Sequence, residues 1–164
     1  MNIFIVDQNP VIAAQSLIDR HVVKMPSECS IMLANAYSLE QLKDAPPRKD
    51  GKPRGRGYSH HGCTKWAVST IDNFNWVLQH GLALCEEYTF RTGKTHFSAH
   101  FLNWCPQPNL SGGFTQPYLA MPNHLKDENY ILAYRNYYST KKFDKAGRWM
   151  YNWTTRQKPD WATL

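Results

Sequence analysis

The sequence predicts a mainly α fold, arranged as a single compact helical domain over residues 1–164. Apolar residues recur at helical spacing through most of the chain, whereas prolines and glycines gather in a few segments. The hydrophobic fraction is 42%, which is enough for one core in a chain of 164 residues. We therefore expect helices joined by long irregular loops, with room for one short strand at the N-terminus.

The first third of the chain contains a strand-like start, two predicted helices and a loop. Residues 2–6 are β-prone, and the turn residues 7–10 lead into a helix with proline near its first position. From residue 11 the apolar spacing predicts a helix that Pro26 breaks or kinks, followed by a second helix to about residue 39. Residues 43–58 contain three prolines and three glycines, so we expect a basic mobile loop.

The rest of the chain continues the helical pattern. Residues 63–79 predict a helix, and the apolar spacing resumes after Gly81 and ends near Gly93. Residues 95–104 predict a short helix, while residues 105–122 contain four prolines and are expected to be irregular. Two further helices are predicted at about 126–138 and 144–153, within or next to an aromatic and basic C-terminal segment, residues 135–164.

Positive charge is concentrated in two segments of this protein, whose net charge is +6. Residues 43–58 contain six basic and two acidic side chains, and residues 135–158 contain seven basic and one acidic. The remaining chain carries 6 basic and 10 acidic residues. This distribution favours a polyanionic partner, a nucleic acid or a nucleotide, although a solvated loop and tail would have the same composition.

Several classes of protein are excluded or disfavoured by the sequence. Apolar runs do not approach the roughly 18 residues of a membrane span, and residues 1–6 lack the features of a secretory signal. The four cysteines form no Cys-x-x-Cys pair, which favours a reduced, intracellular, cytoplasmic protein. His96 and His100 have metal-ligand spacing but no third ligand, so neither a metal nor a cofactor is expected. The oligomeric state stays open.

One group of residues has the spacing of a catalytic site. His21, Lys24 and Glu28 lie three and four residues apart, which places them on one face of a helix that continues through Pro26. An amine beside a carboxylate can form an imine, with the carboxylate stabilising positive charge and moving protons. An exposed ion pair beside a hydrogen-bonded core histidine would show the same spacing.

Two further segments predict substrate or phosphate binding. The run from Tyr58 to Trp66 leaves the basic loop and starts a helix, where backbone amides could hold phosphate; a plain helix start capped by Thr64 or Ser59 is the alternative. The C-terminal segment interleaves aromatic and basic residues, as surfaces that stack bases do, although some of these aromatics must pack on the core. The expected binding residues are Arg54, Arg56, Tyr58, His60, His61, Lys65, Trp66, Arg135 and Tyr138.

These motifs together resemble a known family. Asp19-Arg20-His21 followed by Glu28 is similar to the start of the phage pyrimidine-dimer DNA glycosylases of the endonuclease V type, in which Asp-x-His precedes the catalytic Glu by the same spacing. The run Tyr58-Ser59-His60-His61-Gly62 resembles the Y-S-x-H-P stretch of the wider group, and residues 134–141 resemble its aromatic tail. The H-V-V-K-M motif at residues 21–25 also resembles uncharacterised phage proteins.

The resemblance implies a phage-encoded DNA glycosylase that acts in the host cell, with Glu28 as the catalytic carboxylate and His21 contacting DNA or a base. The family uses the amine of an N-terminal Thr, exposed by removal of the initiator Met, whereas here Asn2 follows Met1. This difference leaves three alternatives. Either Lys24 serves as the imine-forming amine, or the reaction is a hydrolysis without lyase activity, or catalysis is lost.

Three functions follow from the sequence. The first is a DNA glycosylase or glycosylase/AP lyase acting on a damaged or modified pyrimidine. The second is an enzyme acting on a free nucleotide or modified base in a phage nucleotide pathway. The third is a non-catalytic protein that binds and sequesters a nucleotide or nucleic acid.

Overall fold

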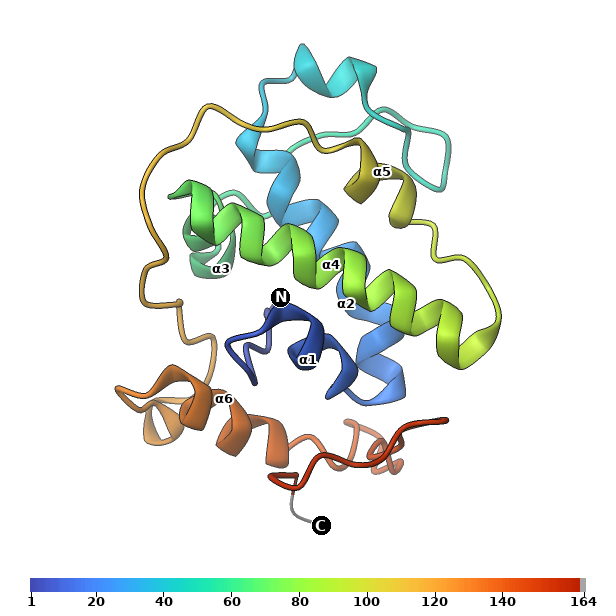
Figure 1. The fold of residues 1–164 in the computed structure, drawn as a ribbon, viewed down its shortest axis with the longest axis vertical. Helices are drawn as coiled ribbons and strands as arrows, with labels where there is room; N and C mark the ends of the chain where they lie inside the picture. Colours follow the sequence, from blue (N-terminus) through green and yellow to red (C-terminus); the bar gives the residue numbers. More distant parts are fainter. Residues whose placement is uncertain (163–164) are drawn as a thin grey trace.

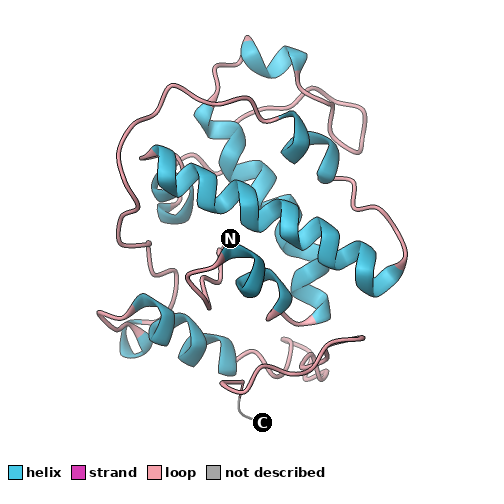
Figure 2. Ribbon diagram, in the orientation of Figure 1, coloured by secondary structure: helices cyan, strands magenta, loops and turns pink. Residues whose placement is uncertain are grey.

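Two long helices cross at the centre of the molecule (Figure 1). In the computed structural model, which describes residues 1–162, α2 (Asp19–Leu33) packs against α4 (Ile71–Thr92), and α1 (Pro10–Gln15) lies along α4 as well. The remaining elements are α3 (Gly62–Ala67), α5 (Ala99–Trp104), α6 (Tyr130–Ser139) and the 3-10 helices η1 (Ala34–Ala36), η2 (Gln41–Asp44) and η3 (Asn123–Leu125). Within residues 1–162 all regular structure is helical (Figure 2), which confirms the predicted fold class.

The N-terminal residues form turns instead of the short strand that the sequence allowed. Ile3, Ile5 and Val6 are fully buried in the core. The Asn2 side-chain oxygen accepts hydrogen bonds from the backbone N–H groups of Ile3 and Phe4, and Phe4 has a φ of 54°. A left-handed backbone at a bulky residue is incompatible with a strand and stores strain, so tertiary contacts must hold it.

The first helix ends earlier than predicted, and Pro26 does not end the second. α1 stops at Gln15, and α2 runs from Asp19 through Pro26 to Leu33. The break at residues 16–18 is stabilised by other elements: Arg91 donates to the carbonyl oxygens of Gln15 and Leu17, and Trp153 donates to that of Ser16. Of the two predicted alternatives, the one in which Pro26 breaks the helix was wrong, because these distant side chains satisfy the backbone at another position and place the boundary there.

The predicted long helix after the loop is divided into α3 and α4. Thr70 caps α4 by accepting from the N–H of Asn73, and Gly93 ends α4 in the left-handed conformation, with φ 71°. Gly81 continues the helix and allows a close approach, since an added Cβ would lie 3.1 Å from atoms of Cys29 and Leu102. The predicted end near Gly93 is confirmed, while the break at residues 68–70 was not predicted.

Residues 144–153 do not form the predicted helix. Phe143 and Trp149 instead form an antiparallel bridge, and Gly147 has a φ of 73° in the turn between them. The Asp144 carboxylate accepts from the backbone N–H groups of Ala146 and Arg148, which competes with helix formation. α6 confirms the other predicted C-terminal helix, although it begins at Tyr130. Residues 163 and 164 of the predicted C-terminal segment lie outside the described residues.

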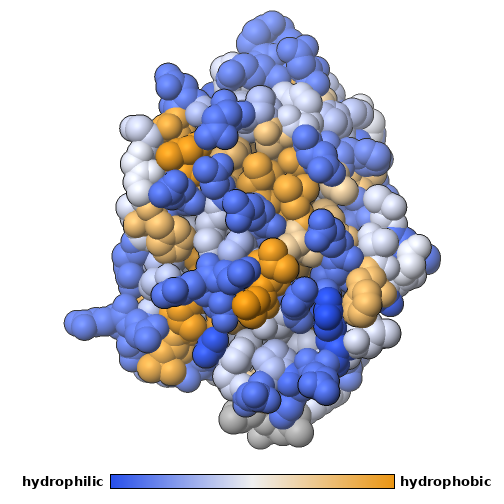
Figure 3. All heavy atoms as spheres, viewed as in Figure 1, coloured by the Kyte–Doolittle hydropathy of each residue, from blue (hydrophilic) through white to orange (hydrophobic). Residues whose placement is uncertain are grey.

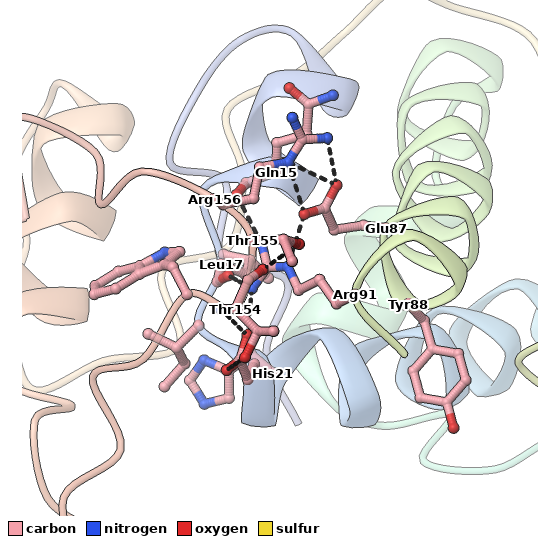
Figure 4. Close-up of polar contacts among 12 residues, drawn as sticks. Gln15, Leu17, His21, Glu87, Tyr88, Arg91, Thr154, Thr155 and Arg156 are labelled. Carbon is pink, nitrogen blue, oxygen red and sulfur yellow. Dashed lines mark hydrogen bonds and ion pairs between the residues drawn. The ribbon is translucent and has the colours of Figure 1, made fainter. Parts of the chain in front are cut away.

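A buried ion-pair network joins the C-terminal segment to the helical core (Figure 4). Glu87 in α4 accepts from Arg91 Nε at 2.7 Å and from Arg156 at 2.9–3.2 Å. Arg91 also donates to Asp19 at 2.8 Å, and Asp19 accepts from the backbone N–H and the hydroxyl of Thr154. The network therefore connects α4, the start of α2 and residues 154–156.

The basic segment 43–58 lies against the core. Apart from its first two residues, which end η2, it is an irregular loop, as predicted. The Arg54 guanidinium lies 4.2 Å from the ring centroid of Phe101, and its Nε donates to the carbonyl oxygen of Pro46. Arg56 Nε donates to the carbonyl oxygen of Tyr37. The end of the molecule that contains η2 is hydrophilic, and apolar patches lie across the middle of the same face (Figure 3).

Candidate active site

A cavity of about 600 Å³ lies between α2, the N-terminal residues and residues 137–150. We call it the Glu28 cavity. Glu28 is nearly buried, and its two carboxylate oxygens have different partners. Oε1 lies 2.9 Å from Lys24 Nζ, and Oε2 accepts from the backbone N–H of Asn2 at 2.9 Å. The continuous α2 helix gives Lys24 and Glu28 their i, i+4 spacing, so the cavity contains a carboxylate in direct contact with a primary amine.

The N-terminal residues form one wall of this cavity. Met1 and Asn2 both line it, and the Asn2 side chain is fixed by donating to the carbonyl oxygen of Ala120. The Met1 sulfur accepts from the Thr64 hydroxyl at 3.3 Å. The nitrogen nearest to Glu28 in this wall is therefore the amide of Asn2, and Lys24 supplies the primary amine in contact with the carboxylate.

His21 lies beside this pair in a nonpolar setting. Its ring stacks on Phe4 with a centroid distance of 4.6 Å, and its Nδ1 is hydrogen-bonded to the Tyr138 hydroxyl at 2.8 Å. Burial, together with the charge of Lys24, lowers the pKa of His21 to about 3. At neutral pH the imidazole is uncharged, so it can exchange hydrogen bonds with a ligand but cannot pair with a phosphate as a cation. Tyr138 is fully buried and does not line the cavity; it contacts two residues that do, His21 and Phe4.

His61 lies close to the same site. It is the N-cap of α3, because its Nδ1 accepts from the backbone N–H of Cys63. Burial lowers its pKa, as does the charge of the N-terminal amine, whereas the charge of Glu28 raises it. The charges of Glu28 and the N-terminal amine therefore both act on His61. α3 begins with a histidine cap in place of the predicted serine or threonine, and it is only six residues long.

A second cavity, of about 480 Å³, lies on the other flank of α2. We call it the loop cavity. Ser27, Ser30 and Ile31 of α2 form one side, and the segment from Arg48 to Tyr58 forms the other. Its positively charged residues are Arg48, Lys49, Arg54 and Arg56, and the ring of Tyr58 is well exposed in it. Three predicted binding residues, Arg54, Arg56 and Tyr58, lie in this cavity, and so do Arg48 and Lys49, which were not predicted as site residues.

A third cavity lies beside α3 and is lined by two lysines, a histidine and two aromatic residues. We call it the α3 cavity. The predicted residues His60 and Lys65 lie in it, and Lys126 faces them from beyond the 105–122 segment. Trp66 lines it as well, but this side chain is nearly buried. Its indole N–H already donates to the Thr115 carbonyl oxygen.

Two other sets of predicted or considered residues lie outside these cavities. Arg135 in α6 donates to the Val6 carbonyl oxygen and pairs with Asp7 at 3.4 Å, so it supports the N-terminal turn. His96 is bonded to the Val23 carbonyl oxygen. Over residues 1–162, the cysteines, histidines and carboxylates form no group of three that could hold a metal ion, and the helices of this region are too short or too polar to cross a membrane.

The sequence did not indicate several residues of the Glu28 cavity. Phe4 lines it through a positive φ that no local motif predicts. Arg20 entered the sequence analysis only as part of the Asp-x-His motif, and the cavity-lining residues after Phe143 fall in the segment 144–153, which was predicted as a helix. Only the concentration of positive charge in residues 135–158 could have suggested that this segment belongs to the site.

The fold and this site define a helical domain with a carboxylate and amine in one cavity, bordered by basic surfaces. The family model for pyrimidine dimer DNA glycosylase matches residues 1–100. The chain therefore belongs to the pyrimidine dimer DNA glycosylase family, as its motifs indicated, and membership implies DNA binding and a DNA glycosylase-like role in repair. No curated protein and no solved structure matches the chain significantly.

Proposed function

We propose that this protein removes a damaged or modified pyrimidine from DNA, with Glu28 as the catalytic carboxylate. The observation that supports this most directly is the contact of Glu28 with Lys24 at 2.9 Å in a cavity of about 600 Å³. A carboxylate in this position stabilises the positive charge that develops on the sugar when the base leaves. His21 contributes hydrogen bonds to the base or the sugar as a neutral ring.

Lys24 is the proposed amine for a lyase reaction. While Met1 is present, the Asn2 nitrogen is an amide, which is a poor nucleophile, whereas Lys24 carries a primary amine in contact with Glu28. The Lys24 amine attacks C1′ of the sugar, the C1′–base bond breaks, and the base leaves with a proton. Loss of the amine protons and opening of the sugar ring then give an imine, with Glu28 moving protons between nitrogen and ring oxygen.

Phosphate binding is assigned to the basic residues around the three cavities. Lys65, His60 and His61 lie beside α3, and Arg54, Arg56 and Tyr58 lie in the loop cavity. The loop cavity shares α2 with the Glu28 cavity, and Leu119 of the α3 cavity is the chain neighbour of Ala120, which lines the Glu28 cavity. Cations on the two sides of this cavity fit a polyanionic strand that passes across it.

Borohydride trapping on DNA with an abasic site tests the assignment of Lys24. The wild type is expected to form a covalent adduct, and mass spectrometry of the adduct should place the bond on Lys24. Lys24→Arg keeps the charge but cannot form the reducible imine, so the adduct should disappear, while Lys94→Arg at the end of α4 should retain it. An adduct on the Met1 amine would contradict the role of Lys24. Base release without an adduct would support hydrolysis instead.

A nucleotide is a second candidate substrate or ligand, and the loop cavity favours it. This cavity combines four cationic residues with an apolar floor at Ile31 and Ala34, separately from Glu28. Incubation with a panel of nucleotides distinguishes the alternatives. Turnover without DNA indicates an enzyme of nucleotide metabolism, and tight binding of an unchanged nucleotide indicates a sequestering protein.

A further inference from the structure

The C-terminal hairpin, which we define as residues 142–150, forms part of the wall of the Glu28 cavity. Phe143, Lys145, Arg148 and Met150 line this cavity opposite α2. The hairpin lies beyond residues 1–100, the part of the chain that matches the family model. Its position therefore brings a segment outside the matched region to the site that contains Glu28.

Asp144 stabilises the turn of the hairpin by hydrogen bonds. Its carboxylate accepts from the N–H groups of Ala146 and Arg148, and also from the guanidinium of Arg148. The same carboxylate lies 2.9 Å from Arg20, which belongs to the first turn of α2. These hydrogen bonds hold the pKa of Asp144 well below its usual range. The hairpin is thus attached directly to the helix that carries Lys24 and Glu28.

Two aromatic rings of the hairpin remain exposed. Phe143 is 56% exposed and Trp149 is 46% exposed, and their rings meet edge to face with a centroid distance of 5.2 Å. Most of the other aromatic side chains of the C-terminal segment are buried or half-buried against the core. Large apolar rings that are exposed on a rigid turn offer a surface for stacking.

The positive charges around the two rings favour a nucleic acid as the partner. Lys145 and Arg148 are exposed in the hairpin, and Lys141 lines the cavity next to it. The only carboxylate of the hairpin, Asp144, is already engaged by two arginines. Exposed rings interleaved with cations are the usual arrangement for stacking bases while neutralising phosphates.

We propose that the C-terminal hairpin contacts damaged DNA by stacking Phe143 or Trp149 on a base that the lesion leaves unstacked. The cations of the hairpin hold the neighbouring phosphates, and the damaged nucleotide lies over Glu28. This proposal rests on the proposed DNA glycosylase function. It makes the hairpin a determinant of specificity for damaged over undamaged DNA, because an intact duplex offers no free base face at this position.

Binding of two duplexes tests the proposal, one undamaged and one with a central tetrahydrofuran abasic analogue. Fluorescence anisotropy with the full-length Phe143→Ala/Trp149→Ala variant should show about tenfold weaker binding to the abasic duplex, on the scale of one lost stack. Binding to the undamaged duplex should change by less than about threefold. Phe90→Ala, which removes a ring that is 55% exposed on α4 and outside the cavity, should leave both affinities unchanged.

A second variant tests the attachment of the hairpin without removing a ring. Arg20→Ala breaks the contact with Asp144 and should reduce the preference for the abasic duplex, whereas Arg20→Lys should restore part of it. Circular dichroism and thermal unfolding show whether each variant is folded. A 2-aminopurine placed beside the abasic site gives an independent readout, since its fluorescence is quenched by the stacked ring in the wild type and should rise in the double variant.

The outcomes separate this proposal from the proposed function. Equal affinities of the wild type and the folded double variant for the abasic duplex overturn the role of the hairpin, while base release by the wild type would still support the glycosylase. A wild type with no preference for the abasic duplex and no base release overturns both. Dimerisation of the wild type that the double variant abolishes, with DNA binding unchanged, would assign the rings to a second copy of the chain.

Discussion

Individual residues of the core show how strongly burial alters chemistry in this protein. His80 in α4 is fully buried beside Trp76, and its Nδ1–H donates to the Pro10 carbonyl oxygen while Nε2 has no partner within residues 1–162. Burial lowers the pKa of His80 to about 4, and it lowers that of His21 to about 3. Both rings are therefore neutral in the folded protein at pH values where they would be protonated in the unfolded chain.

This difference predicts that the protein loses stability as the pH falls from about 7 toward 4. The folded pKa values lie below the unfolded value of about 6.5, so the stabilisation is complete above that value and is lost as the pH approaches the folded pKa values. Urea unfolding at several pH values measures the effect. His80→Gln removes one group that takes up a proton on unfolding, so the slope of the unfolding free energy against pH should fall by up to about 1.4 kcal/mol per pH unit. His124→Gln, at an exposed position, is the control and should leave this slope unchanged. An unchanged slope in His80→Gln would refute the assignment.

At the scale of elements, distant side chains decide where helices end. Arg91 from α4 and Trp153 from the C-terminal segment satisfy the carbonyl oxygens between α1 and α2. Burial tends to raise the pKa of Glu87, but the hydrogen bonds from Arg156 and Arg91 outweigh it and hold this pKa below its usual range. The ion-pair network therefore both places the helix boundary and fixes the C-terminal segment on α4.

Removal of Glu87 should destabilise the fold more than removal of Arg156. Glu87→Ala removes the carboxylate that accepts from Nε of the buried Arg91 and leaves only its pairing with Asp19, at a cost of about 3 kcal/mol in the free energy of unfolding, the lower end of the range for breaking a buried ion pair. Arg156→Ala should cost less, because its side chain is 33% exposed and the Glu87–Arg91 pair remains. Chemical unfolding of both variants at neutral pH gives the two values, and an equal or larger loss in Arg156→Ala would be inconsistent with this network.

The elements also show how far sequence patterns reach. The helical spacing predicted that the segments of α2, α4 and α6 are helical, because their apolar faces point to one core, and it predicted the end of α4 near Gly93; it did not predict the start of α2 or of α4. The same reasoning failed for residues 144–153, where the Asp144 side chain bonds the local backbone and Arg20, 124 residues away. For the site, the sequence predicted the i, i+4 spacing of Lys24 and Glu28. The positions of Asn2 and Phe4 beside Glu28 are visible only in the folded chain.

At the scale of the whole molecule, the two basic segments lie on different sides of α2. Residues of the 43–58 segment form the loop cavity, and residues 141–148 border the Glu28 cavity. The positive charge of these two segments therefore lies next to the candidate active site, while the rest of the chain carries more acidic than basic residues. DNA binding should accordingly weaken steeply with salt, because each phosphate contact releases condensed counterions.

The salt dependence can be assigned to single cations. Lys65→Ala in the α3 cavity should reduce the slope of log K against log salt by about one unit and weaken binding to damaged and undamaged duplexes alike. Lys94→Ala, which removes a cation at the end of α4 outside the three cavities, serves as the control and should leave the slope unchanged. Titrations between 50 and 200 mM salt, the range over which such contacts are usually separated, measure both. Identical slopes in the two variants would exclude Lys65 as a phosphate contact.

The helical class, the spacing of Lys24 and Glu28, the motifs of the family and the two basic segments follow from the amino-acid sequence, because each depends on residues close together in the chain. Three further features required the folded chain: α2 continues through Pro26, Asn2 contacts Glu28, and residues 142–150 border the same cavity. Those features depend on hydrogen bonds between groups 26 to 137 residues apart. Local spacing contains no information about such contacts.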